Sequence, residues 1–258
     1  MTLLTEFFAI VAGVIFEGGL RYVLVAGLGW LVFYTLFRRR LWHRKIIPHA
    51  PATADLRREL LYSARTVVVY ALVGALGVLA VHAGWTQMYY RIARHGWGWF
   101  VASIAIAVVL HDAYFYWTHR AMHHPRLFRW MHRGHHCSTN PTPWAAYSFD
   151  TLEAVVHACI FPLLIFILPI HPLAFFLFMA WQIIFNVLGH TGFEIYPHWL
   201  LRSPIGKIIN TPTNHVMHHQ YFRGNYGLYF NYWDRLMGTN HERYEAQFAE
   251  VTARPRAH

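Results

Sequence analysis

The stretch HDAYFYWTHRAMHHPRLFRWMHRGHH, residues 111–136, joins the end of a long apolar segment to a series of closely spaced histidines. His119 and His123 are four residues apart, so on a helix their side chains lie on one face with Cβ atoms about 5 to 6 Å apart. Two imidazoles at this spacing can bind one metal ion. The stretch therefore predicts an apolar helix that ends in a metal-binding face.

An HxxHH pattern follows in the same stretch and returns in TNHVMHH, residues 213–219. Positions i, i+3 and i+4 of a helix face one way. Adjacent histidines differ by about 100° around the helix axis, so they lean toward neighbouring sites and can serve two metals. The predicted ligands in the two patterns are His132, His135, His136, His215, His218 and His219.

Two further side chains are predicted to lie near the same site, one as a ligand and one as an outer partner of a ligand. His190, in NVLGHTGFE, ends the last apolar segment and should emerge beside the other histidines, which makes it a ninth candidate ligand. Asp112 has nearly the same helical azimuth as His119 and His123. Its carboxylate is expected to accept the second ring N–H of a ligand, as outer partners of metal-bound histidines do.

The number of imidazoles indicates two metal ions. A structural zinc site uses four protein ligands and a catalytic one three, whereas eight or nine are present here. Imidazole suits iron, copper, nickel and zinc. Two redox metals side by side can bind and reduce oxygen, and a membrane setting favours an apolar substrate with an unactivated C–H bond.

Apolar segments on both sides of the opening stretch predict an all-α membrane protein. A bilayer crossing needs about 20 mostly apolar residues, and residues 19–37, 62–84 and 98–118 satisfy this. Residues 155–188 are apolar but are divided by Pro169, His171 and Pro172, which suits two helices joined by a tight turn that cross fully or only partway. We expect four or five spanning or re-entrant helices and one domain over residues 1–258, with the histidine region at about 105–240.

Composition and charge agree with a membrane protein. Hydrophobic residues make up 56% of the chain and charged residues only 13%. The net charge of +10 favours anionic lipid headgroups over nucleic acid, because the basic residues lie beside apolar segments. Two cysteines support neither a disulfide framework nor a thiolate metal site.

The basic residues also predict the orientation. Seven of them, among them Arg38, Arg44 and Arg58, lie between the first two apolar segments, whereas the next connection has only Arg91 and Arg94. The positive-inside rule puts the first connection in the cytosol, and the histidine regions emerge on the same side. The expected architecture is a membrane bundle with a cytosolic helical cap around the metals, in a cell inner membrane or the endoplasmic reticulum.

The histidine patterns resemble those of the fatty acid hydroxylase and sterol desaturase superfamily. Its three boxes, HxxxH, HxxHH and HxxHH, match the pairs and triplets described above, and the late segment NYGLYFNYWDRLMGT resembles the usual ending of the family. The resemblance implies a cytosolic di-iron centre, oxygen as co-substrate, a lipid substrate, and electrons from cytochrome b5 or a ferredoxin with its reductase. Zinc could replace iron in a purified sample.

The segment PTPWAAYSFDTLEA after the second box most resembles the C5 sterol desaturase branch. One departure from some fatty acyl hydroxylases is Asn186, which stands four residues before His190 where they have another histidine. Asn186 is a second candidate for an outer partner, as a residue that holds a water near the metals.

Two other functions remain open at this point. A zinc-type pair would make the chain a metal-dependent membrane hydrolase, although such sites usually include carboxylates. A metal transporter or sensor would place ionisable ligands deep within the spans. Here His157 and His171 are the clear exceptions to a location at span ends, and we interpret them as packing or turn residues. His111 and His124 lie off the ligand face and are left out of the predicted site.

Overall fold

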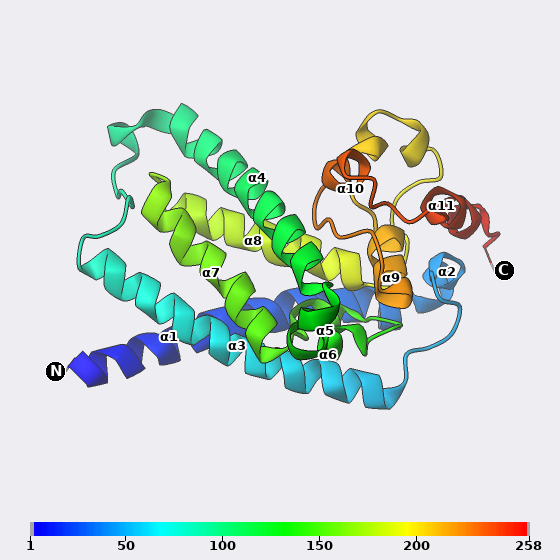
Figure 1. Cartoon of the computed structure of the whole chain (residues 1–258), viewed down its shortest axis with the longest axis horizontal. Coiled ribbons are helices and arrows are strands. Elements are labelled where there is room, and N and C mark those ends of the chain that lie inside the picture. Colours follow the sequence, from blue (N-terminus) through cyan, green and yellow to red (C-terminus); the bar gives the residue numbers. More distant parts are fainter. Residues whose placement is uncertain (1–2, 257–258) are drawn as a thin grey trace.

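The computed structural model describes residues 3–256 as a helical molecule, with only two isolated β-bridges in this part of the chain. Five long helices run along its long axis, and short helices gather at one end (Figure 1). The long helices are α1 (Leu3–Trp30), α3 (Thr53–His82), α4 (Gly96–Met122), α7 (Thr151–Ile167) and α8 (Pro172–His190). The predicted all-α fold is confirmed.

Short elements connect the long helices and form the cap. A π-helical turn, η1 (Leu31–Leu36), extends α1, and 3-10 turns occupy most of the connections. The remaining elements are α2 (Arg38–Leu41), η2 (Trp42–Arg44), η3 (Ile92–Arg94), α5 (Pro125–Met131), α6 (Arg133–His136), η4 (Pro143–Tyr147), η5 (Leu200–Arg202), η6 (Ile205–Lys207), α9 (Pro212–Tyr221), α10 (Tyr232–Leu236) and α11 (Tyr244–Ala253).

Within residues 3–256, four helices are long and apolar enough to cross a membrane: 4–36, α3, α4 and α8. The first begins well before the predicted residue 19, because Glu6, Glu17 and Arg21 do not interrupt the helix. The predicted division of residues 155–188 into two helices is confirmed. His171 caps α8 by accepting the N–H of Leu173, and Pro172 occupies the first turn, where a missing N–H costs nothing.

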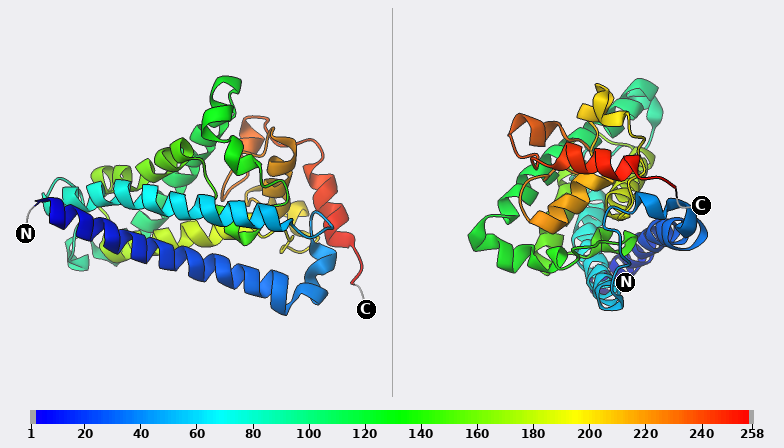
Figure 2. Two further views of the ribbon diagram at one scale, coloured as in Figure 1. Left: turned by 90° about the horizontal axis from the view of Figure 1, so that it is seen from below. Right: turned by 90° about the vertical axis from the view of Figure 1, so that its right-hand side faces the viewer.

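The five long helices pack side by side. Helix α1 lies beside α3 along most of its length and also contacts α8, α3 contacts α7, and α4 packs against both α7 and α8 (Figures 1 and 2). A buried cluster that includes Phe115, Leu164 and Phe178 joins α4, α7 and α8. This packing brings the ends of α4 and α8 to the cap, where the histidines lie.

Candidate metal centre

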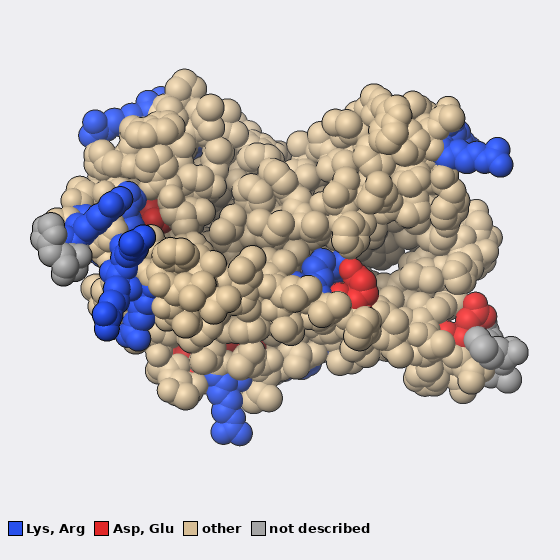
Figure 3. All heavy atoms as spheres, turned by 180° about the vertical axis from the view of Figure 1, so that it is seen from behind, with Lys and Arg blue, Asp and Glu red and all other residues tan. Residues whose placement is uncertain are grey.

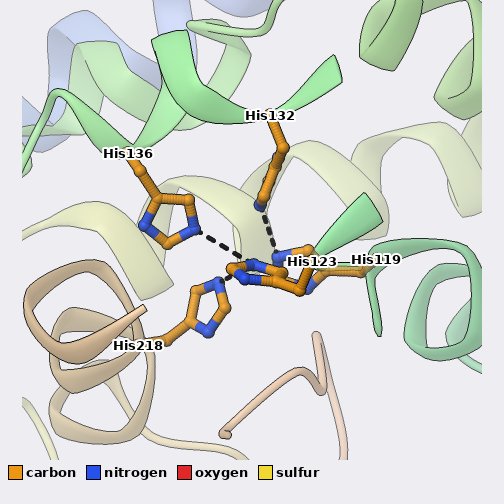
Figure 4. A group of neighbouring side chains, drawn as sticks. All are labelled: His119, His123, His132, His136 and His218. Atoms are coloured by element: carbon orange, nitrogen blue, oxygen red, sulfur yellow. Dashed lines mark hydrogen bonds between the residues drawn. The ribbon is translucent and has the colours of Figure 1, made fainter. Parts of the chain in front are cut away.

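Five histidines from separate parts of the chain converge in one group. His119 lies in the last turn of α4 and His123 just after it, His132 and His136 come from the α6 region, and His218 comes from α9. Their rings point toward one another (Figure 4). The Nε2 atoms of His119 and His132 are 2.9 Å apart, and Nε2 of His123 lies 3.2 Å from Nε2 of both His136 and His218.

The other four predicted ligands form a second group: His135, His190, His215 and His219. Nε2 of His190 lies 2.9 Å from that of His215 and 3.3 Å from that of His219. All four side chains are buried. The structure therefore brings all nine histidines singled out from the sequence into two groups.

Consecutive histidines belong to different groups. His135 is in the second group and His136 in the first, whereas His218 is in the first and His219 in the second. The rings of His136 and His219 are 5.0 Å apart, so the two groups are neighbours. Each HH pair thus contributes to both groups.

The ring spacing fits metal coordination. Metal–nitrogen bonds of about 2.0 to 2.1 Å at near-tetrahedral or octahedral angles separate two ligand nitrogens by about 2.8 to 3.4 Å. The Nε2 separations of 2.9 to 3.3 Å lie at this spacing. Several neutral imidazoles face one another with their Nε2 atoms. The lone pairs of these nitrogens can be satisfied by a bound cation. The residues therefore fit two metal ions.

Main-chain carbonyl groups hold the opposite ring nitrogens. A carbonyl that accepts the Nδ1–H leaves Nε2 as the free lone pair and fixes the orientation of the ring. The pairs are His119 with Tyr226 at 2.9 Å, His135 with Ser148 at 3.1 Å, His190 with Asn186 at 2.8 Å and His218 with Gly224 at 2.7 Å. Asn186 thus contacts a predicted ligand through its main chain, and its side chain donates to the carbonyl of Ala146.

One carboxylate that sequence reasoning missed lies beside the first group. Glu153 is fully buried, and its Oε1 is 2.7 Å from Nδ1 of His132 in a short but bent contact. The same oxygen is 3.6 Å from Nε2 of His157. The available signal was an acidic residue one turn before a histidine in an otherwise apolar helix. Glu153 therefore has the position of an outer partner for a metal-bound imidazole.

The start of α7 positions both Glu153 and α6. Asp150 and Glu153 form a capping box, in which each side chain accepts a main-chain N–H of the first turn. The Asp150 carboxylate also accepts the N–H of Gly134, at 2.6 Å. A Cβ atom at Gly134 would overlap Asp150 and the ring of Tyr62. Glycine is thus required next to His135 for α6 to approach α7.

Asp112 has a different partner from the one expected. Its Oδ1 accepts the main-chain N–H of Tyr229 at 2.9 Å and of Phe230 at 3.2 Å, instead of a histidine N–H. The reason is that residues 229–230 return to this face of α4 and bring two main-chain donors to the carboxylate. Asp112 and the buried Asp234, which binds the N–H of Tyr226 and Gly227, hold the segment that supplies the carbonyl groups of Gly224 and Tyr226.

The histidines omitted from the predicted site lie outside both groups. Nδ1 of His111 is 2.7 Å from the hydroxyl of Tyr229, and exposed His124 caps α5 by accepting the N–H of Arg126. His157 stacks on Phe115 with ring centroids 4.9 Å apart. These contacts agree with packing and capping roles.

Burial keeps the cap imidazoles neutral. Loss of solvation lowers the pKa of His135, His215 and His219 well below the usual range, and neighbouring imidazoles lower these pKa values further. Neutral imidazole is the form that binds metal. The site is therefore in its metal-binding state at neutral pH.

A pH dependence of the metal-free protein follows. The unfolded chain takes up protons near the ordinary histidine pKa of about 6.5 and the folded chain does not, so stability is full above that pH and is lost as the pH falls. We expect the unfolding midpoint of chelator-treated protein to drop by roughly 5 °C or more between pH 7 and pH 5. Thermal unfolding in detergent measures this, with metal-loaded protein as the control. A flat profile would contradict the neutral assignment.

Comparisons with known proteins agree with the residue patterns. The sequence model of the fatty acid hydroxylase family matches residues 104–239. The chain is 32% identical to the Delta(7)-sterol 5(6)-desaturase ERG3B of Gibberella zeae, over 85% of this chain and 64% of that protein. It is 29% identical to the Delta(7)-sterol 5(6)-desaturase erg3C of Aspergillus fumigatus, over 81% of this chain and 69% of the relative.

A human protein is also similar to this chain. Lathosterol oxidase of Homo sapiens is 26% identical over 87% of this chain and 76% of its own length. The chain thus spans roughly two thirds to three quarters of these relatives. No solved structure gives a significant match.

Proposed function

Because the chain belongs to the fatty acid hydroxylase family, we propose that it is a multi-pass membrane oxidoreductase that uses two iron ions and oxygen to desaturate or hydroxylate a lipid. The sterol desaturases among its relatives favour a sterol-like substrate and desaturation. The observation that carries the proposal is the convergence of nine histidines in two adjoining groups.

Each part of the centre has a defined task. The two groups would hold one iron ion each, and Glu153 and four main-chain carbonyl groups would keep Nε2 of five of the nine rings directed at its ion. Iron bound there would supply the oxidising chemistry that removes hydrogen from an unactivated C–H bond. The surrounding cap excludes water, since eight of the nine histidines are buried.

The hydrolase and the transporter receive less support. Metal-dependent hydrolases usually mix carboxylates into the ligand set, whereas both groups found in residues 3–256 consist of imidazoles. A transporter would need ligands along a path through the membrane helices. The nine histidines instead lie at the ends of α4 and α8 and in the cap.

The remaining assignments extend the same proposal. We treat residues 1–258 as one domain with the metals on the cytosolic side, in agreement with the basic residues of 38–58. Oxidation of a lipid by oxygen needs electrons beyond those that the substrate gives up. An external donor of the cytochrome b5 or ferredoxin type would deliver them.

Lipid analysis tests the function directly. Cells that express the chain with a suitable electron donor should accumulate a lipid that differs from its precursor by the loss of two hydrogens, or by the gain of one oxygen if the outcome is hydroxylation. Mass spectrometry of lipid extracts distinguishes the two. Cells that carry the His135→Ala variant are the control, and an identical lipid profile in both would refute an oxidative function.

A further inference from the structure

An apolar cavity of about 470 Å³ lies among the membrane helices. Residues of α1, α3, α7 and α8 line it, including Val14, Val67, Phe161, Phe175 and Met179. Its volume is within the range of about 300 to 1,000 Å³ that small-molecule sites show. The cavity can hold the apolar body of a lipid.

A charged pair lines the same cavity. Arg21 donates to Glu17 one turn before it, and both side chains contribute to the wall. Arg21 lies 17 residues after the start of the candidate span 4–36, which is about 25 Å along the helix and near its middle. Ionisable residues within membrane spans are costly and usually functional.

One face of the molecule carries few charged atoms away from its ends (Figure 3). Figure 3 shows a wide uncharged face on which one small patch combines basic and acidic atoms next to a hollow. The other basic atoms on this face gather mainly toward its ends. An ion pair within a candidate membrane span therefore needs a specific explanation.

Hydrogen-bonding capacity remains unused at the pair. The Nε of Arg21 is buried and has no partner within residues 3–256, whereas Nη1 is bound to Glu17 and the guanidinium also interacts with the hydroxyl of Tyr147. The side chain of Arg21 is 15% exposed and that of Glu17 is 50% exposed. The site thus offers both a donor and an acceptor to a bound group.

The inner end of the cavity approaches the metal centre. Tyr147 lines the cavity, and its ring centroid is 6.3 Å from that of Phe149. The ring of Phe149 is in turn 5.1 Å from that of His135. A molecule in the cavity would be separated from the second histidine group by these aromatic rings.

We propose that this cavity binds an uncharged lipid with one hydroxyl group, and that Arg21 and Glu17 hold that hydroxyl within the membrane. A hydroxyl can donate to the Glu17 carboxylate and accept from Arg21, so both charges stay paired. A carboxylate or phosphate would compete with Glu17 for Arg21 and would leave an unpaired acid in apolar surroundings. The identity of this lipid as the substrate rests on the function proposed above.

Two glycines of α1 provide a matched test of the cavity. Gly18 lines it, Gly13 does not, and a Cβ atom at either position meets nothing within 4 Å. Gly18→Leu should fill the cavity, and Gly13→Leu should not. The full-length protein in nanodiscs is titrated with a radiolabelled 3β-hydroxysterol and with a long-chain primary alcohol. We expect at least one probe to bind, Gly18→Leu to weaken that binding at least tenfold, and Gly13→Leu to leave it unchanged.

The role of Arg21 and Glu17 is tested by comparing the affinities of a hydroxyl lipid and of its methyl ether. The hydroxyl probe should bind roughly tenfold or more tightly than its methyl ether, because hydrogen bonds to charged groups are strong. The double variant Glu17→Gln and Arg21→Gln should lose this preference and still elute as a folded protein on size exclusion. The proposal is overturned if neither probe binds, if Gly18→Leu binds as the wild type does, if the preference survives in the double variant, or if phosphatidylcholine competes equally well.

Binding in the His135→Ala background separates this inference from the enzymatic function. That variant lacks a predicted ligand of the second group but keeps the cavity. Specific hydroxyl-lipid binding there, without any oxidised product from the wild type, would retain the cavity assignment and reject the proposed reaction. Oxidised product from the wild type without any binding in the cavity would do the reverse.

Discussion

Replacing either His135 or His218 with alanine is expected to abolish lipid oxidation. The two residues belong to different groups. Each donates its Nδ1–H to a main-chain carbonyl, so that its Nε2 faces the other rings. Removal of one imidazole leaves an open ligand position, and mutation of outer partners alone already costs about 10- to 100-fold in metal affinity or activity. We expect a loss of more than 100-fold for either variant.

Metal content and product formation together measure this effect. Elemental analysis should find about two iron ions per wild-type chain and fewer in each variant. The control is His124→Asn, since His124 is adjacent to a predicted ligand in sequence but is exposed and only caps α5. Asparagine is a good cap residue, so this variant should keep both metals. Full turnover in His135→Ala or His218→Ala would exclude a metal centre of this composition.

The second large effect is expected for Glu153→Gln. The carboxylate lies 2.7 Å from Nδ1 of His132 and has no solvent to replace it. Glutamine keeps the volume and the hydrogen bond to the N–H of Asp150, but it removes the negative charge next to the ring. We expect metal affinity and turnover to fall by roughly 10- to 100-fold, as for other outer partners of metal-bound histidines.

A buried glutamate elsewhere gives the matched control. Glu59 of α3 is equally buried, but its carboxylate accepts from the hydroxyl of Thr142 and contacts neither histidine group. Glu59→Gln should keep both metals, while Glu153→Gln should lose iron at a lower chelator concentration. Equal chelator sensitivity of the two variants would show that burial of a carboxylate, and not its contact with His132, determines the effect.

The histidine groups could be predicted because the pattern of ligands depends on the separation of histidines along the sequence. Separations of three and four residues place His132, His135 and His136 on one side of a short helical segment whatever the tertiary structure. His190 followed from its position at the end of an apolar segment. The division of neighbours between two groups also follows from the 100° step between consecutive residues.

The outer partners could not be predicted because they depend on tertiary contacts. Glu153 reaches His132 only because α7 packs beside α6, which requires glycine at position 134 and the Asp150 contact. Asp112 was expected to bind a histidine, but its Oδ1 accepts the main-chain N–H groups of Tyr229 and Phe230 instead. Main-chain carbonyl acceptors such as that of Tyr226 cannot be recognised from the amino-acid type, since every residue has one.

The two HH pairs have a mechanical consequence. Because His135 with His136, and His218 with His219, place covalently joined residues in different groups, the spacing between the two histidine groups is set by peptide geometry as well as by packing. A single peptide unit separates consecutive Cα atoms by 3.80 Å whatever the helices around it do. A small movement of α4 relative to α8 would therefore change the outer parts of the site more than the distance between the two histidine groups. The two histidine groups are therefore expected to keep their spacing even where the surrounding helices shift.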